Sequence, residues 1–232
     1  MTIRRVELEQ NLAFVRQRIA AACAEAGRSV ESVILLPVTK TFPAVDLELL
    51  AELGCTDVGE SRDQEARSKR AECTKPMRWH MIGQVQRRKT RQILEWADVV
   101  ESVDRPELAD ALSSAAVNAA KILEVLIQVS LAPAEQAGRG GVSIADVAQL
   151  TSHVLRLPGL RLSGVMAVAP LGADPLLAFG ALPKAHEAVL KLAPEATVIS
   201  AGMSGDLEAA IACGATQVRI GGAILGNRPP LK

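Results

Sequence analysis

One lysine stands where a buried strand should end. The segment ILLPVTK is a run of mostly apolar residues that closes on Lys40. At the rim of such a strand an amine is partly desolvated, which favours its neutral form, the form that attacks a carbonyl carbon to make a Schiff base. The alternative is a solvated surface lysine with no chemical role. Lys40 is therefore a candidate nucleophile whose meaning depends on its neighbours.

Two short turns of small residues lie near the end of the chain. Ser204–Gly205 and Gly221–Gly222 each follow an apolar run and open into a helical pattern. Backbone N–H groups at such turns, helped by helix N-terminal dipoles, could converge on an anion. Phosphate binding by the last two loops also recurs in α/β barrels. The alternative is that the glycines serve only as helix caps and tight turns.

Arg219 is the third residue that could do chemistry. It lies in the alternating segment VRIG, and this position could aim the guanidinium into the interior of a barrel. A buried cation there needs a carboxylate, a phosphate or another acceptor, and a structural ion pair is the alternative to a ligand. Together, a lysine, an anion cradle and an inward arginine describe a site for an aldehyde that carries a phosphate.

These residues can form one site only in a fold that brings the ends of several strands close together. After an amphipathic helix at 2–26, apolar runs with the character of buried strands alternate with helical patterns, which indicates a parallel sheet covered on both faces. The predicted strands are 33–38, 56–59, 78–83, 97–103, 121–129, 160–169, 196–202 and 216–221. The predicted helices between them include 44–54, 86–97, 106–120, 143–157, 173–193 and 204–214.

We therefore expect an α/β fold, a single (β/α)8 barrel of the TIM type with an additional N-terminal helix, in one domain over residues 1–232. An open doubly wound sheet is the alternative, but no GxGxxG follows the first predicted strand. In a barrel, chemistry sits at the carboxyl ends of the strands. Lys40, both turns and Arg219 fall at such ends, and Arg139 falls in the loop after the fifth strand.

Composition excludes several classes of function. Charge balances at 26 basic and 26 acidic residues, and there are only two Trp and three Phe, so we expect no nucleic-acid binding. The N-terminus lacks a signal-peptide core, and no apolar stretch approaches the roughly 18 residues of a membrane span. The four cysteines form no CxxC pair and the three histidines lack ligand spacing. We therefore expect a cytoplasmic protein with no metal site.

Six motifs occur in order over nearly the whole chain, namely VTKTFP, DVGESRDQEA, WHMIGQVQRRK, LSGVMAVAP, SAGMSGDLEAAI and VRIGGAILGNR. In these motifs the chain resembles the pyridoxal phosphate homeostasis proteins, also called proline synthase co-transcribed homologues. The resemblance implies a barrel like the N-terminal domain of alanine racemase, of fold type III and without that enzyme's second β domain. It also implies pyridoxal 5'-phosphate (PLP) bound as an internal aldimine.

By this resemblance, Lys40 matches the aldimine lysine, and Arg219 matches the arginine that faces the pyridine nitrogen. Ser204 and the backbone of Gly221–Gly222 match the phosphate site. Ser200, one strand end earlier, is expected to support the phosphate.

The segment WHMIG matches a part of the family pattern that lines the ring pocket, so His80 and Met81 are expected there, with a packing role as the alternative for His80. Several positions depart from the pattern, among them Thr39 in place of a serine and VQRRK, which lacks the usual asparagine. Ser61 and Arg62 replace the usual asparagine and tyrosine after GE, and Gly222 replaces a threonine and offers only its N–H group. These departures put ring or phosphate contacts from those positions in doubt.

The resemblance favours a protein that holds or delivers PLP over an enzyme. An arginine opposite the pyridine nitrogen does not readily give that atom a proton, which weakens PLP as an electron sink. Alanine racemase uses a tyrosine from its second domain and partner subunit as a further acid–base group, and this chain contains no tyrosine. We therefore expect a monomer that passes PLP to apo-enzymes. The alternatives are a small PLP-dependent racemase or lyase, and a phosphosugar-type barrel enzyme in which Lys40 reacts with another substrate.

Overall fold

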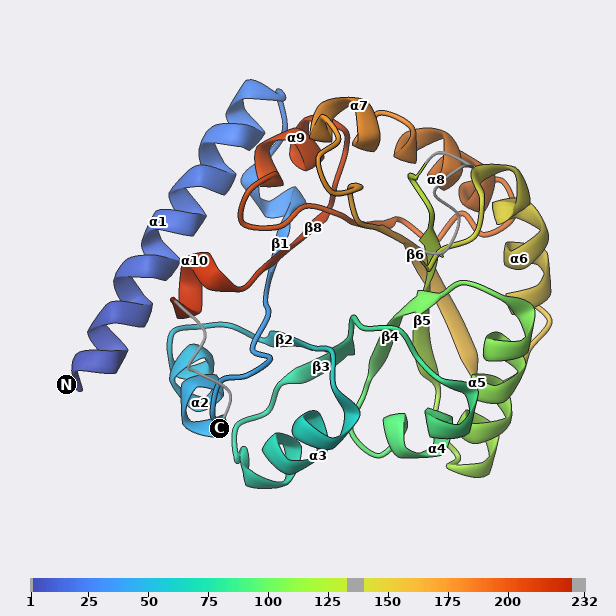
Figure 1. Cartoon of the computed structure of the whole chain (residues 1–232), viewed down its shortest axis with the longest axis horizontal. Coiled ribbons are helices and arrows are strands. Elements are labelled where there is room, and N and C mark those ends of the chain that lie inside the picture. The colour runs from blue at the N-terminus through green and yellow to red at the C-terminus, as the bar shows by residue number, and fades with distance from the viewer. Residues whose placement is uncertain (1, 133–139, 227–232) are drawn as a thin grey trace.

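Eight parallel strands form a barrel, as the sequence predicts. The computed structural model describes residues 2–132 and 140–226, and neighbouring strands follow the order β1-β8-β7-β6-β5-β4-β3-β2. The two ends of this order meet through a parallel bridge between Val38 and Gly59, so the sheet closes into the ring seen in Figure 1. The strands are β1 (Ile34–Pro37), β2 (Asp57–Glu60), β3 (Arg78–Met81), β4 (Val99–Val103), β5 (Leu123–Val129), β6 (Leu160–Ala167), β7 (Val198–Ser200) and β8 (Gln217–Ile220).

Helices surround the ring of strands (Figure 1). They are α1 (Ile3–Glu25), α2 (Ala44–Glu52), α3 (Asp63–Glu72), α4 (Thr90–Ile93), α5 (Pro106–Asn118), α6 (Val147–Val154), α7 (Pro175–Phe179), α8 (Leu182–Leu190), α9 (Leu207–Ala212) and α10 (Gly222–Leu225). Within the described residues, no helix is long and apolar enough to span a bilayer.

The N-terminal helix α1 lies on the outside of the barrel, beside α9 and α10 (Figure 1). Thr2 caps it by accepting a hydrogen bond from the backbone N–H of Arg5 at 3.3 Å. One stripe of apolar residues at helical spacing is buried, namely Leu8, Leu12, Val15 and Ile19. This stripe packs α1 against the last elements of the barrel, α9 and α10.

The apolar core has two separate parts. The larger part fills the layer between the strands and the helices and includes Trp79 and Trp96, whose rings meet edge to face. The smaller part lies apart from it and consists of Val99, Leu126 and Met166. Because alternate strand residues point to opposite faces, these three are apolar side chains of β4, β5 and β6 that point inward. The rest of the barrel interior is largely polar.

Several predicted elements differ in extent. The single helix predicted at 173–193 is two helices, α7 and α8, which meet near Gly180. The helix predicted at 86–97 is a 3-10 turn at Arg87–Lys89 followed by the short α4. Helix α3 was not predicted, because its sequence DQEARSKRAE lacks an apolar stripe. Arg139 lies outside the described residues.

Candidate cofactor site

Lys40 lies in a turn just beyond the carboxyl end of β1, and it is half-buried. The strand ends at Pro37, and Val38 makes the bridge that closes the barrel. Thr41, directly after Lys40, has a φ of 72°, in the left-handed region that β-branched residues rarely adopt. The lysine is thus carried by a sharply turned segment at the mouth of the barrel.

The last loop of the barrel lies next to this turn. Strand β8 pairs with β1, and the N–H of Val38 donates to the carbonyl oxygen of Ile220 at 2.8 Å. A Cβ placed on Gly221 would lie 3.4 Å from the carbonyl oxygen of Val38. Residues that are far apart in sequence, Lys40 and Gly221, therefore sit at neighbouring strand ends.

The two small-residue turns also meet. The N–H of Ala223, in the first turn of α10, donates to Ser204 Oγ at 3.5 Å. The space beside both turns is open, since a Cβ added to Gly205 or Gly222 would meet no atom within 4 Å. The hydroxyl of Ser204 and the backbone of α10 are thus in contact, and the positions beside Gly205 and Gly222 are open, as an anion cradle requires.

Arg219 points into the barrel and is almost fully buried, at 4% exposure. Its Nη1 donates to Ser200 Oγ at 2.7 Å and its Nη2 donates to the carbonyl oxygen of Ala167 at 2.8 Å. Burial lowers the pKa of Arg219, whereas the negative charges of Glu101 and Asp206 act in the opposite direction. These two contacts use part of the guanidinium's five N–H groups, so donors remain for a ligand.

The hydroxyl of Ser200 contacts the guanidinium of Arg219. This hydroxyl donates to Glu101 Oε2 at 2.6 Å and accepts from Gln217 Nε2 at 3.0 Å as well as from Arg219. One donor and two lone pairs are thereby all used. The contact with phosphate expected for Ser200 remains a prediction, and the geometry favours a role in orienting the guanidinium.

His80 lies deep inside the barrel, between two carboxylates. Its Nδ1 is 2.7 Å from Glu101 Oε1 and its Nε2 is 3.0 Å from Asp57 Oδ1. Burial alone would lower the pKa of His80, but the hydrogen bonds and charges of Asp57 and Glu101 raise it to about 9. The ring is therefore an imidazolium at neutral pH that donates from both nitrogens.

Met81 follows His80 in β3 and must face the other side of the sheet. It is buried in the large apolar cluster with Trp79. The two residues therefore cannot both line one pocket inside the barrel, and the ring-pocket role of Met81 stays a prediction without geometric support.

Sequence reasoning missed Glu101, which links His80, Ser200 and Gln217 in the barrel interior. Its carboxylate is completely buried. Burial would raise the pKa of Glu101, but His80 and Arg219 hold it below its usual value. A signal was present, because a glutamate inside the apolar run ADVVESV needs a buried cationic partner.

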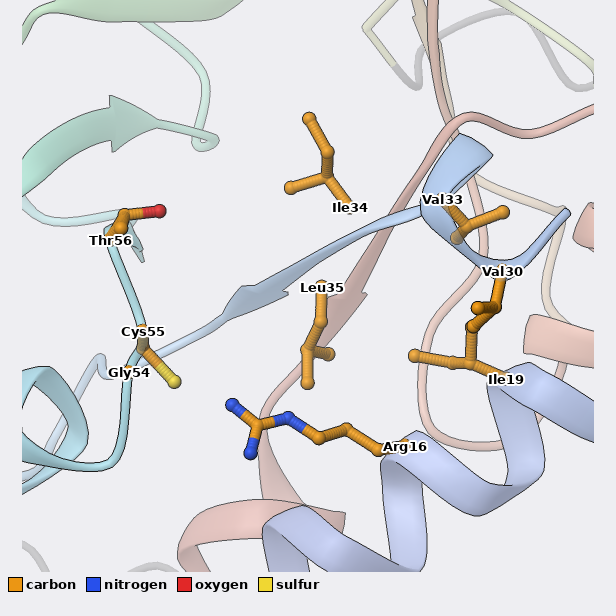
Figure 2. Close-up of a pocket in the computed structure, with 9 residues that line it drawn as sticks. All are labelled: Arg16, Ile19, Val30, Val33, Ile34, Leu35, Gly54, Cys55 and Thr56. Carbon is orange, nitrogen blue, oxygen red and sulfur yellow. The ribbon is translucent and has the colours of Figure 1, made fainter.

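A cavity of about 270 Å³ lies away from this site (Figure 2). Arg16 from α1, Val33 and Ile34 at the start of β1, and Cys55 before β2 line it. It is therefore at the opposite end of β1 from Lys40. No cluster of metal-ligating side chains occurs in the described part of the chain.

Comparisons with known proteins show which family this chain is similar to. The model of the alanine racemase N-terminal domain matches residues 7–229. A Mycobacterium tuberculosis (strain ATCC 25618 / H37Rv) protein called pyridoxal phosphate homeostasis protein is 42% identical, over 97% of this chain and 94% of the relative. The Escherichia coli (strain K12) protein of the same name is 34% identical, over 96% and 97%. The solved structure of PipY from Synechococcus elongatus PCC7942 with PLP bound has a TM-score of 0.82 and 29% identity, covering 94% of this chain and all of that one.

Proposed function

Because the chain belongs to the pyridoxal phosphate homeostasis protein family, we propose that it binds PLP at the barrel mouth and buffers or delivers this cofactor inside the cell. The observation that carries the proposal is the juxtaposition of Lys40 with the open space beside Gly222, on neighbouring strand ends. An amine and an anion cradle on neighbouring strand ends suit a phosphorylated aldehyde.

Each residue has a proposed task. Lys40 would hold the aldehyde carbon of PLP covalently through Nζ, a condensation that releases the aldehyde oxygen as water. Ser204 Oγ and the backbone N–H groups of Gly221 and Gly222 hold the phosphate dianion, and Arg219 faces the pyridine nitrogen. PLP would supply an aldehyde, and the bond that this group makes with Lys40 would be reversible by exchange with another amine, so the cofactor could be released as well as held.

Holding PLP without turnover is the second part of the proposal. Arg219 stays charged and is held by Ser200 and the Ala167 carbonyl, so it does not readily protonate the pyridine nitrogen. The chain contains no tyrosine to act as the opposing acid–base group of a racemase. Both features disfavour the carbanion chemistry of PLP enzymes.

The wider setting follows from the same proposal. The chain acts in the cytoplasm as a monomer of one domain, and its partners are apo-enzymes that accept PLP. Transfer then requires only that an amine of the recipient replaces Lys40 at the aldehyde carbon.

Lys40→Ala tests the covalent part. We expect purified wild-type protein mixed with PLP to gain a visible absorbance band that borohydride abolishes, and peptide mapping to place the reduced adduct on Lys40. The variant should lose the band and the adduct while its circular dichroism spectrum stays unchanged, because a half-buried residue in a turn contributes little to the core.

Two other results would redirect the proposal. An adduct on a different lysine would remove Lys40 from its assigned role. Exchange of amino acid α-protons much faster than with free PLP would establish the racemase or lyase alternative in place of a carrier.

A further inference from the structure

The backbone on both sides of Lys40 is attached to one buried cluster of charged side chains. Thr39, before the lysine, donates from Oγ1 to Glu60 Oε1 at 2.6 Å. Thr41, after it, donates its backbone N–H to Glu65 Oε1. The reactive lysine is therefore flanked by two fixed points.

Lys69 joins these two points. Its Nζ donates to the carbonyl oxygen of Thr39 at 2.8 Å, to Glu60 Oε1 at 2.8 Å and to Glu65 Oε1 at 2.5 Å. The residue is only 5% exposed. All three hydrogens of its ammonium group are thus used within the cluster, and one of them goes to the residue before Lys40.

The cluster compensates for two unfavourable features. Thr41 adopts a left-handed φ of 72°, which a β-branched residue keeps only when its surroundings impose it. Glu60 is a completely buried carboxylate. Burial raises the pKa of Glu60, while the charge and hydrogen bond of Lys69 and the hydroxyl of Thr39 act in the opposite direction.

This arrangement exceeds what the packing of α3 needs. An ion pair between Glu65 and Lys69 at i and i+4 would stabilise the helix by itself. The additional bonds to the Thr39 carbonyl and the Thr41 amide reach the segment that carries the lysine. Neither bond contributes to the helix.

We propose that Lys69, with Glu60 and Glu65, is a positioning residue that holds the Thr39–Thr41 turn so that the amine of Lys40 meets the aldehyde carbon of PLP. Lys69 itself does not touch the cofactor. This inference rests on the proposed function, since it gives Lys40 the covalent role described above.

The experiment compares two ligands. Pyridoxine 5'-phosphate has the ring and phosphate of PLP but an alcohol in place of the aldehyde, so it probes the cradle without the covalent bond. Dissociation constants for both ligands, and the rate at which the PLP band appears, are measured for wild type, Lys69→Met, Glu65→Ala and Glu65→Gln. Lys75→Met is the matched control, because the side chain of Lys75 is 42% exposed and makes its ion pair with Glu52, at 3.7 Å, away from the Thr39–Thr41 turn.

For Lys69→Met and Glu65→Ala we expect the dissociation constant for PLP to rise roughly tenfold, the scale of one lost charge-assisted hydrogen bond. That for pyridoxine 5'-phosphate should stay within about twofold. Glu65→Gln should recover wild-type values, because its amide oxygen still accepts from Thr41. If Lys69→Met does not fold, the pair at position 65 decides the question.

Three outcomes overturn the inference. Equal losses for both ligands would make the cluster merely structural, unchanged values for both would leave it without a role, and equal values for Glu65→Ala and Glu65→Gln would exclude the bond to Thr41. Absence of a borohydride-stable adduct in the wild type would instead remove the proposed function itself.

Discussion

At the scale of residues, different side chains border the phosphate cradle and orient the guanidinium of Arg219, a division that the sequence motifs do not show. The phosphate cradle is built from small residues with open space beside them, Ser204 and Gly222. The guanidinium of Arg219 is instead held in one orientation by the Ala167 carbonyl and by Ser200, whose hydroxyl has all its bonds used inside the barrel. The groups that border the cradle are open, whereas Ser200, which orients the guanidinium, is saturated.

Ser204→Asp is the sharpest test of the cradle. A carboxylate beside the phosphate dianion repels it, and even a partly screened pair of like charges costs about 1–4 kcal/mol. We expect at least a tenfold weaker affinity for PLP, measured by equilibrium titration. Pyridoxal, which lacks the phosphate, should bind with nearly unchanged affinity, and Ser204→Ala should have a smaller effect. Equal effects on both ligands would place the phosphate elsewhere.

At the scale of elements, α1 supports the cradle from outside the barrel. Arg18 Nη1 donates to the carbonyl oxygen of Ser204 at 3.0 Å, and Asn11 Nδ2 donates to that of Ile224 at 2.9 Å. Arg4 Nη2 reaches the carbonyl oxygen of Leu225 at 3.1 Å. Because α10 is a single turn, its carbonyls need such partners. The N-terminal helix is thus tied to both turns that form the cradle.

Arg18→Gln should therefore loosen the cradle. The substitution removes the bond to the Ser204 carbonyl and the two bonds to Glu208 on α9. The bond to the carbonyl, worth about 1 kcal/mol, predicts a threefold to tenfold weaker affinity for PLP and a smaller change for pyridoxal. The matched control is Arg16→Gln on the same helix, where Nη2 donates to the carbonyl oxygen of Leu53, away from the cradle. Titrations that show no difference between the two variants would argue against this support.

At the scale of the whole molecule, closure of the barrel creates a polar interior that no single element contains. Glu101 from β4 accepts hydrogen bonds from His80 of β3 and from Ser200 and Gln217 of β7 and β8. Arg219 adds a second cation to this network through Ser200. Buried charges are tolerated here because each has a partner, so the loss of one leaves an uncompensated charge in the core.

The network predicts a pH dependence of stability. The folded-state pKa of His80 is raised to about 9, above the roughly 6.5 of an unfolded histidine. Its contribution is therefore complete below about pH 6.5 and is lost as the pH rises through 9, with a fall of ~2 kcal/mol between pH 6 and pH 8. Asp57 and Glu101 have lowered pKa values, so their contribution is lost only on acidification.

Urea unfolding of wild type and His80→Gln at pH 6 and pH 8 measures this effect. The wild type should lose stability relative to the variant as the pH rises, and contributions common to both proteins, such as that of the Cys55 thiol, cancel in the difference. A difference in unfolding free energy that does not change with pH would show that His80 is not charged in the folded protein.

Sequence patterns alone determined the order and kind of most elements. Apolar runs of strand character and helical periodicity are local properties, so the barrel and its N-terminal helix could be predicted without contacts. Lys40, Arg219 and the turn at Gly221 could be placed at the mouth, because all parallel strands end at the same edge of a barrel. Helix α3 escaped prediction, since its buried Lys69 binds polar groups instead of forming an apolar stripe.

Only the tertiary structure decided which side chains meet. Strand register and barrel closure bring Glu101, His80 and Ser200 into contact across the interior, and these are long-range relations that no local pattern encodes. The same holds for the cluster that flanks Lys40, which joins the ends of β1 and β2 to α3. The sequence identifies the candidate groups for binding a phosphorylated aldehyde, but the folded chain determines which side chains hold those groups in place.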